Sequence, residues 1–277
     1  METLIKSILI IFIFIIFFVA CDDDGSKTIV KDNKDSSHTQ NLSKEFTFSN
    51  YNWKIKETKD FADSRIFCLT NRKNVSINND GSLVLKITKI GDYWYGGELT
   101  IDTTLGFGEY SFEIYSPQNS FDANANLSLT ILNLSDENYE GLTQTGIRFS
   151  KNSDIKSKNE LEYFLYSTDK KIAGIHIPEK PFLINNKISV HKIGIYPDYI
   201  YYTSKSGSEF NEFKTFKKNN ISGFSDDISF AQSTGTLKVI ISLCLADANE
   251  PVSNKDVEVA IKKFKFSPAA NDITLNK

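Results

Sequence analysis

Along most of the chain, apolar and polar positions alternate over short runs that are separated by turn-forming residues. Residues 109–114 place Tyr110, Phe112 and Ile114 at every second position, with polar residues between them. Residues 127–131 repeat the same pattern. Such alternation is typical of β-strands with one buried and one solvated face. About a dozen runs of this kind, with no amphipathic helix among them, predict an all-β sandwich.

Two local features add detail to this prediction. Apolar runs at residues 75–77 and 83–87 flank a turn that contains Asp80 and Gly81. Asp-Gly between two such runs predicts a β-hairpin, because the turn requires positive φ angles. Near the end of the chain, the apolar positions change parity around residues 262–263, which predicts a β-bulge.

The N-terminus carries a second kind of signal. An unbroken apolar run over residues 8–19 is followed by Ala20 and Cys21. A bilayer-spanning helix needs roughly 20 apolar residues, so residues 1–20 are predicted to be a signal peptide. A small residue directly before a cysteine at the end of such a run is typical of bacterial lipoproteins. We therefore expect cleavage before Cys21 and lipidation of its sulfur; an ordinary cleaved signal with a spare cysteine is the alternative.

Residues 21–44 are predicted to be a lipidated, disordered tether, because they are polar and contain no aromatic residue. The folded domain is expected over residues 45–270, followed by a C-terminal tail at 271–277. These features predict a protein of the cell envelope, anchored by lipid to a bacterial membrane. The acidic run at residues 22–24 resembles signals that send some lipoproteins to the outer surface, and a plain solvated linker is an equally open interpretation.

Composition narrows the classes of partner. The formal net charge of −3 is small for 277 residues, and the lysines are scattered among acidic residues. No basic stripe is present, so nucleic-acid binding is not expected. Aromatic residues make up 13% of the chain, which suits a β-rich protein.

Besides Cys21, the chain contains Cys68 and Cys244. These two residues could pair in an oxidising compartment. Both lie within apolar segments, however, which favours two buried free thiols. No cluster of His and Cys has the spacing of metal ligands, and neither a metal nor another cofactor is expected.

Two longer segments resemble a known family. Residues 93–114 read YWYGGELTIDTTLGFGEYSFEI and residues 239–268 read VIISLCLADANEPVSNKDVEVAIKKFKFSP. Both are similar to glycoside hydrolase family 16, the laminarinase and lichenase relatives. Gly106 and Gly108 would provide the tight bend of the family's Gly-aromatic-Gly turn. The resemblance implies a concanavalin-like jelly-roll β-sandwich.

The family's catalytic strand has the form E-x-D-x-E or E-x-D-x-x-E, whereas residues 144–149 of this chain read QTGIRF. Residues i, i+2 and i+4 of a strand share a face, so Gln144, Gly146 and Arg148 would stand where the carboxylates belong. Retaining hydrolysis needs two carboxylates about 5–5.5 Å apart, and Arg stays protonated. The resemblance therefore implies a degenerate catalytic strand, and we assign no catalytic residue.

Other positions fit the same interpretation. Glu160 and Glu162 share a face, but Phe164 occupies the third position of that pattern. We interpret this segment as the next strand of the sheet, with both carboxylates on a solvated face. The resemblance also places Cys244 where the family has the Trp of its aromatic sugar platform, and makes His191 a structural remnant.

The function expected from the sequence is a membrane-anchored lipoprotein whose jelly roll binds a polysaccharide or other glycan without cleaving it. The candidate glycan-binding residues are Tyr93, Trp94, Tyr95, Glu98 and Arg148. Aromatic faces stack on sugar rings, and an Arg guanidinium can form two parallel hydrogen bonds to a carboxylate or sulfate. Structural alternatives stay open: Trp94 in the core, and Glu98 with Arg148 as an ion pair filling a dead cleft. So do two other functions, a divergent retaining glycosidase and an adhesion or structural protein.

Overall fold

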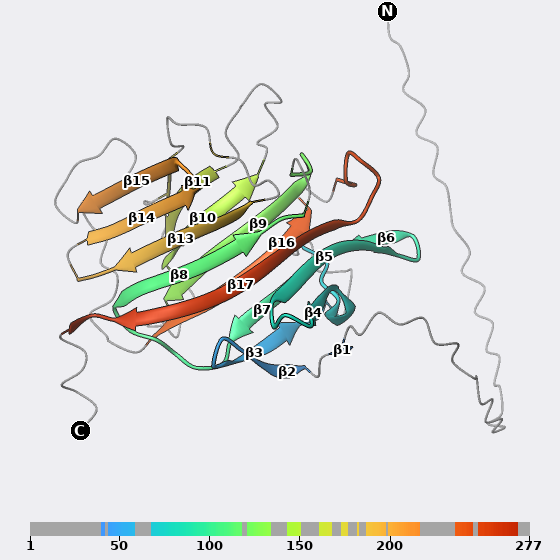
Figure 1. Cartoon of the computed structure of the whole chain (residues 1–277), viewed down its shortest axis with the longest axis horizontal. Coiled ribbons are helices and arrows are strands. Elements are labelled where there is room, and N and C mark those ends of the chain that lie inside the picture. Colours follow the sequence, from blue (N-terminus) through green and yellow to red (C-terminus); the bar gives the residue numbers. More distant parts are fainter. Residues whose placement is uncertain are drawn as a thin grey trace, which may run out of the picture. The chain divides into compact units, whose positions relative to one another are not determined.

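The folded part of the chain consists almost entirely of β-strands. The computed structural model describes residues 40–41, 44–58, 68–117, 121–133, 143–150, 161–167, 173–176, 182, 187–197, 199–216, 236–245 and 249–270. Within these residues the chain forms 17 strands and one short 3-10 helix, Arg72–Asn74. The strands build two antiparallel sheets, which lie face to face (Figure 1). The predicted all-β sandwich is therefore confirmed.

The two sheets are of similar size. The nine-stranded sheet runs in the order β1 (Gln40–Asn41), β4 (Val75–Ile77), β5 (Leu83–Ile90), β17 (Val257–Pro268), β8 (Gly108–Tyr115), β13 (Ile188–Ile195), β14 (Tyr199–Ser206) and β15 (Glu209–Phe216), with β6 (Tyr93–Tyr95) paired to β5. The eight-stranded sheet runs in the order β12 (Ala173–His176), β11 (Leu161–Ser167), β10 (Thr143–Ser150), β9 (Ala125–Asn133), β16 (Leu237–Leu245), β7 (Gly97–Ile101), β3 (Tyr51–Lys56) and β2 (Glu45–Phe48).

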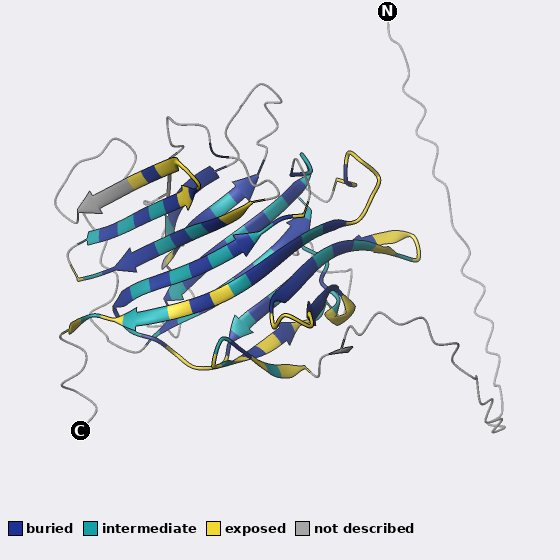
Figure 2. Ribbon diagram, in the orientation of Figure 1, coloured by how far each residue is buried: buried dark blue, intermediate teal, exposed yellow. Residues whose placement is uncertain are grey.

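The hydrophobic core lies between the sheets, where every second residue of each strand points inward. Phe112 and Ile114 of β8 are completely buried, and so are Val259 and Ile261 of β17. Figure 2 shows buried residues in dark blue alternating along the strands with more exposed ones. The alternation in the sequence therefore identified the inward faces of these strands correctly.

The predicted hairpin and bulge are both present. Strands β4 and β5 pair antiparallel, and Gly81 in their turn has a φ of +79°. In β17, the register against β8 shifts between Ile261 and Lys263. Because the bulge adds one residue, Ile261 and Phe264 both face the core despite their odd spacing.

Of the predicted N-terminal segments, only the last part is described in the structure. Residues 1–20, Cys21 and the tail at 271–277 lie outside the described residues. Strand β1 falls inside the range predicted as a tether and pairs with β4, so sheet pairing begins before residue 45. In the described part of the chain, no helix has the length and apolar character needed to cross a bilayer.

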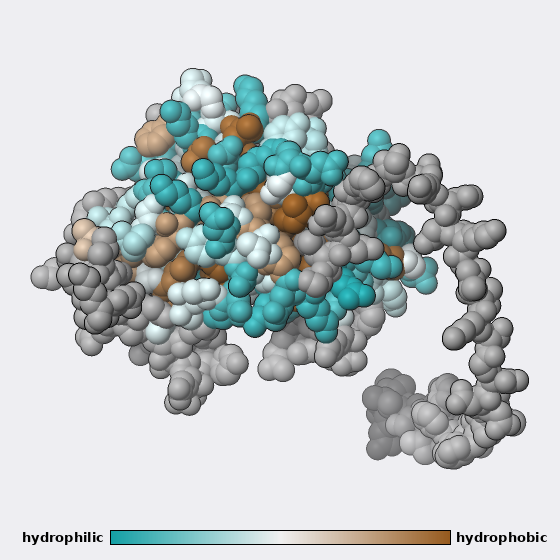
Figure 3. All heavy atoms as spheres, turned by 60° about the horizontal axis from the view of Figure 1, so that its bottom comes forward, coloured by the Kyte–Doolittle hydropathy of each residue, from teal (hydrophilic) through white to brown (hydrophobic). Residues whose placement is uncertain are grey.

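On the face shown in Figure 3, hydrophobic residues form separate groups among hydrophilic ones.

Candidate functional site

Strand β10, which carries the degenerate catalytic sequence, lies between β9 and β11 in the eight-stranded sheet. Its Ile147 and Phe149 are fully buried in the core. Gln144 is exposed and Arg148 is half-buried, since the alternate positions face away from the core. The outer face of the eight-stranded sheet, meaning the side turned away from the other sheet, is therefore where the candidate residues of β10 stand.

Arg148 belongs to a compact cluster with three residues of β11: Glu162, Phe164 and Tyr166. Its Nε lies 3.5 Å from Oε2 of Glu162, and its Nη2 donates a hydrogen bond of 2.8 Å to the Tyr166 hydroxyl. The guanidinium carbon is 5.0 Å from the centre of the Phe164 ring, within the range of cation–π attraction. This group, called here the Arg148 cluster, satisfies the charge of Arg148 within the protein.

The burial of Glu162 corrects one sequence-based expectation. The segment is indeed the next strand of the sheet, but Glu162 is only 4% exposed, so it does not lie on a solvated face. Arg148 and Ser150 of β10 lie against it. Burial raises the pKa of Glu162, and the charge of Arg148 opposes that rise. Glu160 lies outside the described residues.

Gly146 is the central position of the degenerate strand, and no side chain fits there. A Cβ atom at this residue would stand 2.2 Å from the Leu129 carbonyl oxygen and 2.6 Å from Cζ of Phe164. The phenyl ring of the neighbouring strand therefore occupies the space above Gly146. A carboxylate could not be placed at this position without displacing both neighbours.

Glu98 lies on β7, on the same outer face, but it does not contact Arg148 in an ion pair. Its carboxylate is 2.9 Å from Nζ of Lys56 on β3. The register places Glu98 opposite Ser242 of β16, Ser242 opposite Ser128 of β9, and Ser128 opposite Arg148. The alternative in which Glu98 and Arg148 form one ion pair is therefore wrong, because two strands separate them.

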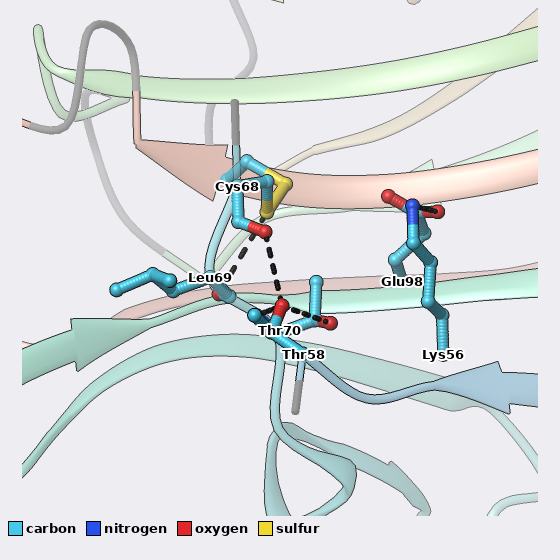
Figure 4. Close-up of polar contacts among 7 residues, drawn as sticks. Lys56, Thr58, Cys68, Leu69, Thr70 and Glu98 are labelled. Carbon is cyan, nitrogen blue, oxygen red and sulfur yellow. Dashed lines mark hydrogen bonds and ion pairs between the residues drawn. A yellow bond between two sulfur atoms is a disulfide. The ribbon is translucent and has the colours of Figure 1, made fainter. Parts of the chain in front are cut away.

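A disulfide lies close to the Lys56–Glu98 pair (Figure 4). Cys68 is bonded to Cys244, with their Cα atoms 5.4 Å apart, so the expectation of two free thiols is wrong. Cys244 has the parity of Ser242 and hence faces outward from β16, and residues 69–71 pair with Gly96 next to the start of β7. There Gly96 donates a backbone hydrogen bond of 2.7 Å to Leu69. The disulfide thus links the segment that begins at Cys68 to β16.

The outer face therefore has a polar cluster at each side and a centre that carries small side chains. Ser242, Ser128 and Thr130 occupy the middle strands, and the hydroxyls of Ser128 and Thr130 are 3.2 Å apart. Glu98 and Glu162 stand on opposite sides of this centre. Four strand-to-strand steps of about 4.8 Å separate β7 from β11, which places the backbones that carry these carboxylates roughly 19 Å apart. Paired glycosidase carboxylates are no more than about 9.5 Å apart.

A closer pair of carboxylates, which the sequence did not reveal, lies at the β2–β3 end of the same sheet. Lys54 places its Nζ 2.6 Å from Asp102 and 3.6 Å from Glu45. These residues line a pocket of about 180 Å³ together with Asn52. The hydrogen bond from Lys54 lowers the pKa of Asp102 and raises the pKa of Lys54. An ammonium group therefore separates the two carboxylates and holds Asp102 ionised, so it cannot serve as a general acid.

The aromatic candidates occupy different environments. Tyr93 is 55% exposed on β6, whereas Trp94 is 8% exposed and packs in the core, with Nζ of Lys89 5.9 Å from its ring centre. Tyr95 is half-buried. Strand β6 pairs with β5 of the nine-stranded sheet, while Glu98 lies on the eight-stranded sheet. The candidate residues of this segment are thus divided between the two sheets.

His191 of β13 lies in the core rather than on the outer face. Its ring nitrogens are 2.9 Å from the Ser204 hydroxyl and 2.7 Å from the Ser189 hydroxyl, and its ring packs edge-on against Phe149. Burial lowers the pKa of His191 to about 3. The residue is a neutral, hydrogen-bonded part of the core, and its environment offers no access to a substrate.

Solved structures, rather than sequences, identify proteins that are similar to this chain. No family model matches the sequence, and no curated protein matches it. Among solved structures, a Bacillus licheniformis β-glucanase has a TM-score of 0.58 at 14% identity, covering 82% of this chain and 99% of that one. A Mycobacterium tuberculosis pseudo-β-1,3-glucanase has a TM-score of 0.57 at 11% identity, with coverages of 78% and 91%.

A third similar structure is a Bacteroides ovatus GH16 protein of the mixed-linkage glucan PUL, in complex with a G4G4G3G product. It has a TM-score of 0.56 at 11% identity, covering 78% of this chain and 94% of that one. All three likenesses extend over most of the folded part of the chain. The β-sandwich described above is therefore the jelly-roll fold of glycoside hydrolase family 16.

Proposed function

We propose that this protein binds a polysaccharide on the outer face of its eight-stranded sheet and does not hydrolyse it. The observation that carries the proposal is the composition of β10, where Gln144, Gly146 and Arg148 occupy the outward positions. The fold is that of an enzyme family, but this strand lacks the carboxylates on which the family's chemistry depends.

The described carboxylates elsewhere on this face do not replace the missing ones. Glu162 has the raised pKa expected of an acid, but it is paired with Arg148 and stands far from Glu98. Glu45 and Asp102 are close together, but Lys54 lies between them and keeps Asp102 ionised. A glycosidase needs one protonated and one ionised carboxyl group on either side of the same bond. None of these pairs meets that requirement.

Glycan binding is supported by the chemistry of the same surface. The middle strands present hydroxyl groups, Gln144 presents an exposed amide, and the Arg148 cluster presents a guanidinium and an aromatic hydroxyl. Together these groups can hydrogen-bond to sugar hydroxyls. The similar Bacteroides ovatus protein holds a glucan product, and the similar Mycobacterium tuberculosis protein is named a pseudo-enzyme. The first comparison is consistent with glycan binding by this fold, and the second with loss of catalysis while the fold is kept.

Binding measurements with matched variants test the proposal. The full chain is incubated with a panel of insoluble β-glucans, and bound protein is measured against free protein. Gln144→Ala removes an exposed amide from the outer face and should weaken binding about two- to tenfold, the usual range for one hydrogen bond. Lys205→Ala, an exposed substitution on the nine-stranded sheet, should leave binding unchanged. Equal binding by both variants would contradict the proposed face, and no binding to any glycan would favour an adhesion or structural role.

The proposal extends to the location of the protein. Lipidation at Cys21 would hold the jelly roll at a membrane surface through the polar segment that precedes residue 45. Multiple acyl chains anchor a protein stably, whereas a single chain does so only marginally. The support for this part is the apolar run, Ala20 and Cys21 in the sequence. An anchored glycan-binding domain would keep a polysaccharide close to the cell.

A further inference from the structure

Three tyrosines form an ordered group on the other side of the molecule. Tyr196 follows β13, and Tyr199 and Tyr201 lie on β14. Their ring planes are within 16–26° of parallel, and their ring centres are 4.7–6.4 Å apart. Each of the three is half-buried. This group, called here the tyrosine platform, is unrelated to any residue of the site described above.

The platform faces away from the core. Ile200 and Tyr202, which alternate with Tyr199 and Tyr201, are buried between the sheets, so the platform residues of β14 point outward. Gly194 of β13 pairs with Tyr201, and a Cβ at Gly194 would stand 2.0 Å from the Tyr201 ring. The absence of a side chain at Gly194 is therefore what lets the Tyr201 ring lie against the sheet.

A polar network fixes one edge of the platform. The Tyr201 hydroxyl donates a hydrogen bond to Glu109, and Nζ of Lys192 donates a 2.9 Å bond to the other oxygen of that carboxylate. Burial would raise the pKa of Glu109, but the bonds from Tyr201 and Lys192 lower it overall. Burial and the bond to Glu109 raise the pKa of Tyr201. Glu109 therefore stays ionised and Tyr201 stays protonated, which preserves this network at neutral pH.

We infer that the tyrosine platform is a second glycan-binding surface, which stacks on sugar rings and hydrogen-bonds their hydroxyls through Glu109 and Lys192. Rings held in place before binding lose little conformational entropy when a ligand arrives. The inference goes beyond the proposed function, because it concerns the opposite sheet and holds whether or not the eight-stranded sheet binds.

The geometry and charge of the platform decide between ligand classes. Cages for quaternary ammonium groups surround the cation with aromatic faces, and three nearly parallel rings cannot do so. Nucleic-acid bases also stack on tyrosines, but such sites lie in positively charged grooves. Here Glu109 offsets the charge of Lys192 at the platform's edge, and the chain has a net charge of −3. A sugar ring, which has an apolar face and a rim of hydroxyls, fits both the rings and the network.

Nuclear magnetic resonance of the full chain with ¹³C-labelled tyrosine rings tests this inference directly. Laminarihexaose, cellohexaose and xylohexaose serve as probes, and single Tyr→Phe substitutions assign the platform signals. We expect one of these probes to shift the platform signals. Tyr199→Ala should weaken that binding at least about fivefold, the lower end for loss of one stacking ring, whereas Tyr199→Phe should retain it. Phe210→Ala removes an exposed aromatic of β15 outside the platform and should have no effect.

Each remaining outcome overturns the inference. Platform signals that do not move with any probe, or binding unchanged in both Tyr199→Ala and Tyr196→Ala, would show that the platform binds none of these glycans. Self-association that is lost in Tyr199→Ala would assign the platform to contacts between copies of the chain. The test is separate from that of the proposed function, because Gln144→Ala should leave the platform signals and their titration unchanged.

Discussion

Acidification should destabilise the sandwich through one buried imidazole, that of His191. Burial lowers the pKa of His191 from 6.5 to about 3, so the unfolded chain binds a proton more readily than the folded one. The contribution of neutral His191 to the free energy of unfolding is therefore complete above pH 6.5. It is lost as the pH falls toward 3. At about pH 4.5, roughly two units below the unfolded pKa, the loss is about 2.7 kcal/mol, since each unit corresponds to about 1.36 kcal/mol.

The assay is urea denaturation of the full chain and of His191→Gln at about pH 7 and about pH 4.5. Carboxyl groups that are hydrogen-bonded in the folded state also lose stabilisation on acidification, but they do so in both proteins. The variant starts from a lower stability because Ser189 and Ser204 lose a partner. Its further loss on acidification should be smaller by about 2.7 kcal/mol. An equal pH dependence in the two proteins would refute the description of His191 as a neutral core residue.

Three further predictions concern other parts of the chain. Gly146→Ala should destabilise the protein by about 1–3 kcal/mol through overpacking, and a denaturation midpoint equal to that of Ser128→Ala would contradict the close approach at this glycine. Reduction of the Cys68–Cys244 disulfide should lower the free energy of unfolding by about 2–5 kcal/mol, because it closes a loop of 176 residues; identical denaturation curves with and without reductant would exclude this. Cys21→Ser should release the protein from the membrane fraction or stall its processing, and normal retention with normal cleavage would rule out lipid anchoring there.

The sequence predicted the fold because the relevant signals are local. Alternation around Phe112 and Val259 reports which residues of one strand face the core, and the Asp80-Gly81 turn reports one hairpin. The parity change near residues 262–263 likewise marked the bulge. Each of these features is decided within a few neighbouring residues, so none requires knowledge of which distant strands pair.

The candidate site was predicted less completely, because its contacts join distant segments. Both cysteines lie in apolar segments, which favoured two buried free thiols, and nothing in the sequence showed that Cys68 and Cys244 would lie within bonding distance. From the sequence, Glu162 is expected on a solvated face, whereas it is 4% exposed and lies against Arg148 and Ser150 of the neighbouring strand. The same limitation hid the contacts of Lys54 with Glu45 and Asp102, because these three residues come from three separate strands or turns.

The most direct test of the central claim measures hydrolysis and binding in one incubation. The full chain is mixed with insoluble β-1,3, β-1,4 and mixed-linkage glucans, and released reducing ends are measured together with protein retained on the pellet. We expect retention on at least one glycan with no reducing ends above background. Reducing-end release that disappears in Glu162→Gln or Asp102→Asn would contradict it and would establish a displaced active site.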